Sequence, residues 1–222
     1  MTSLTTPSSS IARVCTPSSR LRVAVLASGS GSNLQALLDR AAHADCAFEV
    51  VVVVVNVVSA YALDRAAAAH VEAVCVPHKG LDRQTHERQI LDVLMARDVE
   101  LVVLAGYMRV VTSTLLDRFV RAVVNVHPAL LPSFPGLHGA KQALDHGCRV
   151  AGCTVHLVDS GVDTGPILAQ AAVPVLCDDD EAALQRRIQI EEHRLLPSCV
   201  DDIAAGRVVV RDGRVRLLDR SS

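Results

Sequence analysis

The sequence predicts an α/β fold in which helices cover both faces of an open, mostly parallel and twisted sheet, with an antiparallel hairpin portion toward the C-terminus. Short valine-rich runs that are apolar on both faces recur along the chain, as is typical of strands buried from both sides. Longer stretches with helical periodicity separate these runs, which is the alternation of parallel strands joined by crossover helices. A glycine-rich turn follows the first run and opens a helix, as in many α/β domains that bind phosphates.

The first half of the chain predicts five strands, because five apolar runs have the length of a strand and end at polar or turn-forming residues. These runs are Leu21–Ala27, Phe48–Asn56, Ala73–Val76, Leu101–Leu104 and Arg121–Asn125. The stretches between them carry helical periodicity and predict helices over Asn33–Ala42, Tyr61–Ala69, Arg83–Arg97 and Thr112–Phe119.

The second half predicts a different order of elements. A proline-rich loop comes first, then a short helix, then two apolar runs around an Asp/Gly-rich turn that predict a hairpin. An acidic run suited to a helix N-terminus begins the last long helix, and an Asp-Gly turn predicts a small terminal hairpin. In order, these elements occupy residues 127–136, Ala140–His146, Ala151–Val158 with Pro166–Val175, the stretch from about Asp179, and the surroundings of Asp212 and Gly213.

The composition predicts a single domain with a tail. The chain has 222 residues, 50% of them hydrophobic, which is enough for one substantial core. We expect one domain over residues 21–222, with a phosphate-binding α/β half (21–125) and a half that holds the catalytic loops, the hairpin and the C-terminal helix (126–222). Residues 1–20 are rich in Ser, Thr and Pro and lack acids, so we expect a disordered tail; a short transit peptide is the alternative.

Charge and cysteine usage disfavour several classes of function. The formal net charge of −2 provides no basic face for nucleic acid, and no apolar run approaches the roughly 20 residues of a membrane helix. The seven cysteines lack C-x-x-C spacing, and the nine histidines form no metal-binding motif. We therefore expect a cytoplasmic protein with small-molecule substrates, no nucleic-acid or membrane partner, no metal and reduced thiols that mostly fill the core. The sequence is compatible with a monomer and with a homodimer.

The turn after the first strand, Ser28-Gly-Ser-Gly-Ser-Asn33, has the features of an anion site. Glycines let the backbone approach a ligand, and a helix N-terminus presents free N–H groups with a favourable dipole. A dinucleotide site is disfavoured, because Leu34 replaces the third glycine of that fingerprint and Asn56 stands where an acid would bind ribose. An ordinary tight turn with a helix cap is the alternative to our expectation, a single phosphate bound by Ser30, Gly31, Ser32 and Asn33.

Asn125 and His127 stand two residues apart in an apolar run that stops at Pro128. Residues at this spacing point to the same face of a strand, and the proline ends the strand, so the pair lies at its carboxyl end. Ligands bind at that end in open parallel sheets. An amide that donates to an oxyanion beside an imidazole that transfers a proton suits acyl-group chemistry, whereas a histidine alone is more often structural.

A carboxylate that holds the imidazole and favours its charged form would complete such a site. Asp163, in a Gly/Thr-flanked turn after a strand, is the preferred candidate, and Asp159 is the competitor that spacing does not exclude. Glu192 lies in the last long helix, where the charge pattern alone predicts a solvated face. Arg109 follows the carboxyl end of a strand and either steers an acidic ligand or caps surface backbone.

These motifs, in this order, resemble the glycinamide ribonucleotide formyltransferases of purine biosynthesis, within the wider family of enzymes that move formyl groups from 10-formyltetrahydrofolate. The N-x-H-P element is specific to the wider family, and SGSGSN narrows the resemblance to the ribonucleotide enzymes. The resemblance extends over nearly everything from Leu21 to about Gly206, through the segments LASGSGSNLQALLD, LVVLAGYMRVV, VVNVHPALLPSFPGLHG, VAGCTVHLVDSGVDTGPILAQ and IEEHRLLP.

The resemblance implies a Rossmann-like formyltransferase fold and transfer of a formyl group to the amine of glycinamide ribonucleotide in de novo purine (IMP) biosynthesis. It implies 10-formyltetrahydrofolate as co-substrate, no permanently bound cofactor and no metal. Asn125 and His127 would stabilise and protonate the tetrahedral intermediate, assisted by Asp163. The loop Ser30, Gly31, Ser32, Asn33 would bind the phosphate and Glu192 the ribose hydroxyls. The folate would contact Arg83, Met108, Arg109, Val110, Val111 and Asn125.

Three alternatives follow from the same motifs. Methionyl-tRNA formyltransferases carry an additional C-terminal β domain, and formyltetrahydrofolate hydrolases typically have a second histidine where Pro128 stands, so we expect neither. A non-catalytic nucleotide-binding regulator would share the fold and the glycine turn, but it has no need of Asn125, His127 and Asp163. The match is weakest between Val74 and Asp98, where Pro77-His-Lys-Gly80 replaces an acidic loop.

Overall fold

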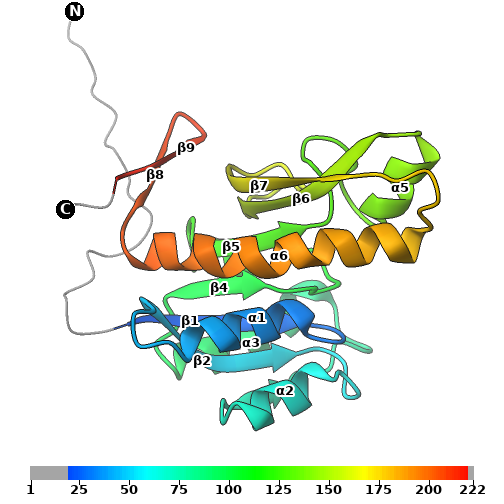
Figure 1. Cartoon of the computed structure of the whole chain (residues 1–222). Helices are drawn as coiled ribbons and strands as arrows, with labels where there is room; N and C mark the ends of the chain where they lie inside the picture. Colours follow the sequence, from blue (N-terminus) through cyan, green and yellow to red (C-terminus); the bar gives the residue numbers. More distant parts are fainter. Residues whose placement is uncertain (1–19, 220–222) are drawn as a thin grey trace, which may run out of the picture.

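The structure is a computed structural model that describes residues 20–219 and contains one large mixed sheet and one small hairpin (Figure 1). The tail predicted over residues 1–20 therefore lies, except for Arg20, outside the described residues. The strands are β1 (Leu21–Ala27), β2 (Phe48–Val55), β3 (Ala73–Cys75), β4 (Leu101–Leu104), β5 (Val123–His127), β6 (Val150–Leu157), β7 (Ile167–Pro174), β8 (Val208–Arg211) and β9 (Arg214–Leu217). The helices are α1 (Ser32–Ala41), α2 (Ala62–Ala68), α3 (Arg83–Met95), α4 (Ser113–Leu116), α5 (Gly139–Asp145) and α6 (Glu181–Ala204).

The large sheet has the order β3-β2-β1-β4-β5-β6-β7. Its first five strands pair in parallel, and β6 and β7 pair antiparallel, so the predicted mostly parallel sheet with an antiparallel hairpin portion is confirmed. The chain builds outward from β1 through β2 to β3, and then returns to place β4 on the other side of β1. In open sheets such a reversal leaves a crevice at the carboxyl ends of the two central strands, because the loops that follow them diverge.

Helices cover both faces of this sheet. α1 and α6 pack side by side on one face, and α3 lies with α4 on the opposite face (Figure 1). The side of α1 that meets the sheet carries Leu34, Leu37 and Leu38, and α6 begins its buried side with Leu184 and Ile188. These residues recur at helical spacing, so the apolar stripe predicted by periodicity is the stripe that is buried.

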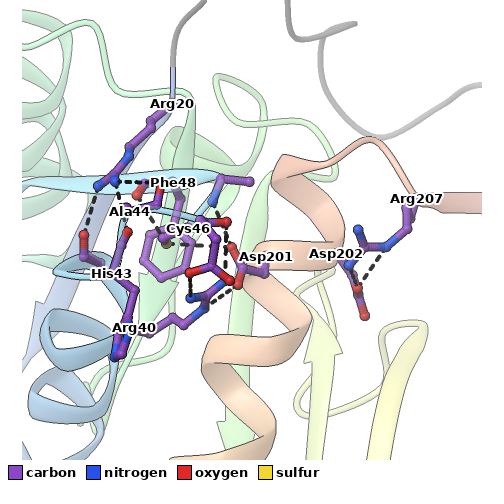
Figure 2. A network of polar contacts seen from close by, with 12 residues as sticks. Arg20, Arg40, His43, Ala44, Cys46, Phe48, Asp201, Asp202 and Arg207 are labelled. Carbon is purple, nitrogen blue, oxygen red and sulfur yellow. Dashed lines mark hydrogen bonds and ion pairs between the residues drawn. The ribbon is translucent and has the colours of Figure 1, made fainter. Parts of the chain in front are cut away.

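A polar network ties α1 to α6 and to the start of β2 (Figure 2). Asp201 of α6 accepts hydrogen bonds from Arg40 Nε at 2.5 Å and from the backbone amide of Ala47 at 2.9 Å. Arg40 also contacts Asp45 at 2.7 Å in the loop between α1 and β2. One carboxylate of α6 therefore binds both the end of α1 and the residue before β2, which fixes how α6 lies against the first half of the domain.

Most predicted elements end within one or two residues of the observed ones, and two of the differences lie close to the candidate site. The fifth strand spans Val123–His127 instead of Arg121–Asn125, because Arg121 has a φ of 55° and such left-handed backbone cannot continue a strand. The helix predicted over Thr112–Phe119 is a single turn, Ser113–Leu116, followed by turns, because the chain must reverse at Arg121 to enter β5. Asn125 and His127 consequently both belong to the strand, and Pro128 follows it directly.

The cysteines that the structure describes all have free thiols. Cys46, Cys153 and Cys199 are buried in the core, Cys75 and Cys148 are half-buried and pack against it, and Cys177 is exposed, so the prediction of thiols that mostly fill the core holds for the described cysteines. Across residues 20–219, no helix combines the length and the apolar character needed to cross a bilayer.

Candidate active site

The candidate site lies where three neighbouring parallel strands end. Strand register aligns Leu26 of β1 with Leu104 of β4, and Leu104 with Asn125 of β5. The loops that follow these strands are the glycine loop, the segment 105–111 and the segment after His127. The sequence prediction that Asn125 and His127 lie at the carboxyl end of the sheet is therefore supported by the pairing of the strands.

His127 is buried, and both of its ring nitrogens have a defined environment. Nε2 lies 2.8 Å from the backbone carbonyl of Phe134. Because a carbonyl oxygen can only accept, Nε2 must carry a hydrogen. Nδ1 lies 3.5 Å from Oδ2 of Asp163, so it is the nitrogen that can gain and release a proton beside a carboxylate. This separation is longer than a strong hydrogen bond, as is common in catalytic sites without bound substrate.

Of the two candidate aspartates, the structure brings Asp163 to His127. Its Oδ2 also accepts from the Gly136 amide at 2.8 Å, and its Oδ1 lies 3.6 Å from Nε2 of His156. Burial raises the pKa of Asp163, but the contact with His156, the hydrogen bond from the Gly136 amide and the charge of His127 lower that pKa below its ordinary value overall. Asp163 is therefore an anion at neutral pH.

Asp159 has a different role. Its Oδ1 accepts from the Gly161 amide at 3.0 Å and from Oγ1 of Thr164 at 2.7 Å, so its carboxylate stabilises the turn itself. The spacing of the sequence did not separate the two aspartates, and the contacts of their side chains do.

His156 is a site residue that the sequence interpretation missed. It is buried on β6, opposite Asn125 in the strand register, and its Nε2 lies 3.2 Å from Asn125 Nδ2. Its Nδ1 lies 2.9 Å from the carbonyl of Leu157 and must carry a hydrogen, and in the tautomer with that single hydrogen Nε2 accepts one hydrogen from the Asn125 amide. The second hydrogen of that amide remains for a ligand. The available signal was a lone imidazole in an otherwise apolar strand.

A cavity of about 620 Å³ opens in front of these residues. Asn125, His127, His156 and Asp163 line it together with all the predicted folate contacts, Arg83, Met108, Arg109, Val110 and Val111. Met108 and Val110 are exposed apolar side chains at this cavity, whereas Val111 is buried. Arg109 Nη1 lies 3.4 Å from the carbonyl of His78, a long contact that leaves most of its guanidinium available. The cavity thus combines apolar walls with cationic groups.

The glycine loop begins α1 as predicted. Gly31 is the N-cap and has a φ of 69°, a conformation that glycine adopts without strain. Asn33 Nδ2 donates to Oε2 of Glu192 at 2.9 Å, and both side chains are buried. The prediction of a solvated face for Glu192 from the charge pattern is therefore wrong, because this side of α6 faces α1. Burial raises the pKa of Glu192. The buried Oδ1 of Asn33 has no hydrogen-bond partner among residues 20–219, so it is free to accept from a ligand.

Two hydrogen bonds join the glycine loop to the cavity wall. The Ser28 amide donates to the carbonyl of Gly106 at 3.1 Å, and the Met108 amide donates to Ser28 Oγ at 2.9 Å. The glycine loop and the cavity are therefore adjacent, on the two sides of the strand reversal between β1 and β4. In the part of the chain that the structure describes, no three His, Cys, Asp or Glu side chains converge as metal ligands would.

An open α/β sheet that holds an amide, an imidazole and a carboxylate between a glycine loop and a largely apolar cavity suits the chemistry of a group-transfer enzyme. A family model described as formyl transferase matches residues 21–200. The chain belongs to this family.

Individual relatives agree with the family. The chain is 46% identical over 197 residues to phosphoribosylglycinamide formyltransferase of Mycobacterium tuberculosis, a match that covers 87% of this chain and 90% of that protein. It is 43% identical over 198 residues to the trifunctional purine biosynthetic protein adenosine-3 of Drosophila melanogaster, covering 86% of this chain and 14% of that longer protein. The crystal structure of glycinamide ribonucleotide transformylase 1 from Symbiobacterium toebii matches with a TM-score of 0.90 and 45% identity, covering 95% of this chain and 100% of that one.

Proposed function

We propose that this chain transfers a formyl group from 10-formyltetrahydrofolate to the amine of glycinamide ribonucleotide, as a step of de novo purine synthesis. The observation that carries the proposal is the placement of His127, with its Nδ1 facing Asp163, on the wall of a cavity directly beside the glycine loop. A non-catalytic binding module has no need of a buried imidazole and carboxylate at the junction of two ligand sites.

The reaction requires one new bond and two proton transfers. The amine nitrogen bonds to the formyl carbon, the bond from that carbon to N10 of the folate breaks, one proton leaves the amine and one reaches N10. The formyl oxygen is negatively charged in the tetrahedral intermediate. Asn125 Nδ2, which gives one hydrogen to His156, donates its other hydrogen to this oxygen. His127 supplies a proton from Nδ1 to the tetrahedral intermediate.

Asp163 acts through His127. A carboxylate 3.5 Å from Nδ1 stabilises the protonated imidazole and keeps the transferable proton on this nitrogen. The Gly136 amide holds that carboxylate in place, so the loop after β5 and the turn after β6 are positioned together. We assign His127 and Asn125 to the reacting atoms and Asp163 to the support of His127.

The two substrates enter from opposite sides. The phosphate of the ribonucleotide binds at Ser30, Gly31, Ser32 and Asn33, and Glu192 accepts from the ribose hydroxyls. The support for this assignment is the unpartnered Oδ1 of Asn33 next to the buried Glu192 carboxylate. The folate binds in the cavity, with its pterin against Met108 and Val111 and its acidic portion near Arg83 and Arg109, since all four residues line this cavity.

The test is a two-substrate assay with purified protein, 10-formyltetrahydrofolate and glycinamide ribonucleotide, without added metal or nucleoside triphosphate. We expect folate product to form when both substrates are present and not when the ribonucleotide is omitted. His127→Ala should reduce turnover by at least about 10²-fold, the lower end of the contribution of general acid–base catalysis. Product at an equal rate without the ribonucleotide would show a hydrolase, and no product at micromolar enzyme would refute the proposal.

We further propose that residues 21–222 act as one domain, that the protein is cytoplasmic, and that its partners are small-molecule substrates. The sheet that runs unbroken from β3 to β7 and the free thiols of the described cysteines support the first two. The acid–base set needs no permanently bound cofactor or metal, so activity should survive a chelator. Light scattering coupled to size-exclusion chromatography distinguishes the two states that we consider, a monomer and a homodimer.

A further inference from the structure

Two hydrogen bonds connect the glycine loop to α2. In both, the group of the loop that accepts is a backbone carbonyl. The Ala62 amide at the start of α2 donates to the carbonyl of Gly29 at 3.1 Å. One turn later, Arg65 Nε donates to the carbonyl of Ser30 at 2.8 Å. Two successive carbonyls of the loop are therefore held toward the same helix.

This arrangement fixes the direction of the amides. In a trans peptide the C=O and N–H bonds point in opposite directions. The carbonyl of Gly29 shares its peptide with the amide of Ser30, and the carbonyl of Ser30 shares its peptide with the amide of Gly31. Both amides consequently point away from α2, and neither has a hydrogen-bond partner among residues 20–219. Successive free amides on one side of a loop form a concave anion site, which the first amides of α1 extend.

Arg65 is held where it can perform this task. Its Nη1 donates to Oε1 of Gln35 on α1 at 3.0 Å, and its guanidinium lies over the Tyr61 ring, 5.0 Å from the centroid. A Cβ added to Gly31 would lie 2.9 Å from the Ala62 Cβ and 3.3 Å from the Arg65 Cδ, so the loop and α2 fit closely. The side chain thus joins α1, α2 and the loop by three separate contacts.

We propose that Arg65 is a positioning residue of the phosphate subsite, which rests on the proposed function. By binding the carbonyl of Ser30, its Nε–H turns that peptide so that the Gly31 amide faces the phosphate. It also removes a carbonyl dipole, which would repel the phosphate, from the face of the loop where the phosphate binds. The predicted effect is on the binding of the ribonucleotide and not on the folate or on the proton transfer.

The test uses three substitutions of Arg65 and one matched control. Gln places its amide nitrogen at the same number of bonds from Cα as Arg Nε, so Arg65→Gln keeps the donor to Ser30 and removes the charge. Arg65→Met removes both, and Arg65→Lys keeps the charge with a longer reach. Arg88→Met is the control, because Arg88 is an exposed helical arginine whose guanidinium donates to Thr85 Oγ1 at 3.0 Å, away from the loop.

For Arg65→Met we expect the KM for glycinamide ribonucleotide to rise about 10-fold, the effect of losing roughly one aligned hydrogen bond to a charged group. The KM for 10-formyltetrahydrofolate should stay within about twofold of the wild-type value. In Arg65→Gln, the KM for the ribonucleotide should return most of the way to the wild-type value. The thermal midpoint of each variant shows whether it is folded. If Arg65→Met is unstable, the comparison of Arg65→Gln with Arg65→Lys still separates the donor to Ser30 from the charge.

Two results would overturn the inference. An unchanged ribonucleotide KM in folded Arg65→Met would show that the loop does not need Arg65. If the KM for the ribonucleotide rose as much in Arg65→Gln as in Arg65→Met and stayed near wild type in Arg65→Lys, the charge of Arg65 and not the orientation of the peptide would matter. Absence of activity in the wild type would instead refute the proposed function, so the two failures are distinguishable.

Discussion

Replacement of Asp163 by asparagine removes one negative charge from the site and leaves its shape almost unchanged. The asparagine oxygen can still accept from the Gly136 amide, which donates to Asp163 at 2.8 Å, so the loop after β5 keeps its anchor. His127 Nδ1, 3.5 Å from the carboxylate, loses the group that stabilises its proton. The substitution therefore separates the charge of Asp163 from its contribution to the fold.

The size of the effect follows from this distance. Two unit charges 3.5 Å apart interact by about 5 kcal/mol at an effective dielectric constant of about 20. Solvent screens little of this interaction, because the side chains of His127 and Asp163 are 5% and 12% exposed. Relaxation and entry of water into the variant recover part of the energy. We therefore expect a loss of about 3 kcal/mol of transition-state stabilisation, which corresponds to a roughly 10²-fold lower kcat.

The assay is kcat for formyl transfer at saturating substrates, measured across pH. We expect Asp163→Asn to lower kcat by this amount and to shift the acidic limb of the pH–rate profile. Asp159→Asn is the matched control, since its carboxylate accepts from Gly161 and Thr164 within the same turn and should change kcat by less than about threefold. A wild-type kcat in Asp163→Asn, or an equal loss of kcat in Asp159→Asn, would show that the charge of Asp163 does not support His127.

Three further predictions concern stability and binding. Because the pKa of Asp163 is below its ordinary value, its carboxylate stabilises the fold above about pH 4 and loses this contribution as the pH falls through the folded-state pKa. In urea unfolding, the difference in the free energy of unfolding between wild type and Asp163→Asn should therefore shrink below about pH 4. A difference that stays constant with pH would contradict this link between protonation and stability. Glu192→Gln keeps an acceptor for Asn33 but loses the carboxylate, so the KM for the ribonucleotide should rise about 10-fold at an unchanged folate KM, and an equal rise in both would contradict its assignment. Asp201→Ala removes the contacts to Arg40 and to a backbone amide and should lower the free energy of unfolding by about 2 to 3 kcal/mol, whereas a loss under about 0.5 kcal/mol would show that the network does not stabilise the packing of α6.

The fold was predictable from the sequence wherever local pattern and tertiary environment agree. A run such as Leu21–Ala27 is apolar on both faces, and a strand buried on both sides is the simplest way to bury it. The start of β5 was not predictable, because it depends on the left-handed conformation of Arg121. That conformation arises from the reversal of the chain after α4 and not from a turn residue in the sequence.

The candidate site shows the same division. Asn125, His127 and Pro128 form a local pattern, and strand geometry alone places the first two on one face. His156 was missed, because only the antiparallel register of β5 and β6 brings it opposite Asn125. A lone histidine in an apolar run is otherwise indistinguishable from a histidine that serves the core.

Glu192 was misinterpreted from its charge pattern for a related reason. Its burial depends on the packing of α6 against α1, which places its carboxylate on Asn33, a residue far away in the sequence. Arg65 is similar, because its contact with Ser30 joins two helices and a loop. Side chains that act through tertiary contacts carry no local signal in the sequence.

In the proposed reaction, the formyl group bound in the cavity around His127 passes to an amine and not to water. The most direct measurement is the fate of a ¹³C-labelled formyl carbon, followed by NMR with 10-formyltetrahydrofolate, glycinamide ribonucleotide and wild-type protein. The label should appear as the formamide of the ribonucleotide, and His127→Ala should slow its appearance at least about 10²-fold. Label found as free formate, or an undiminished rate in His127→Ala, would contradict the proposed reaction.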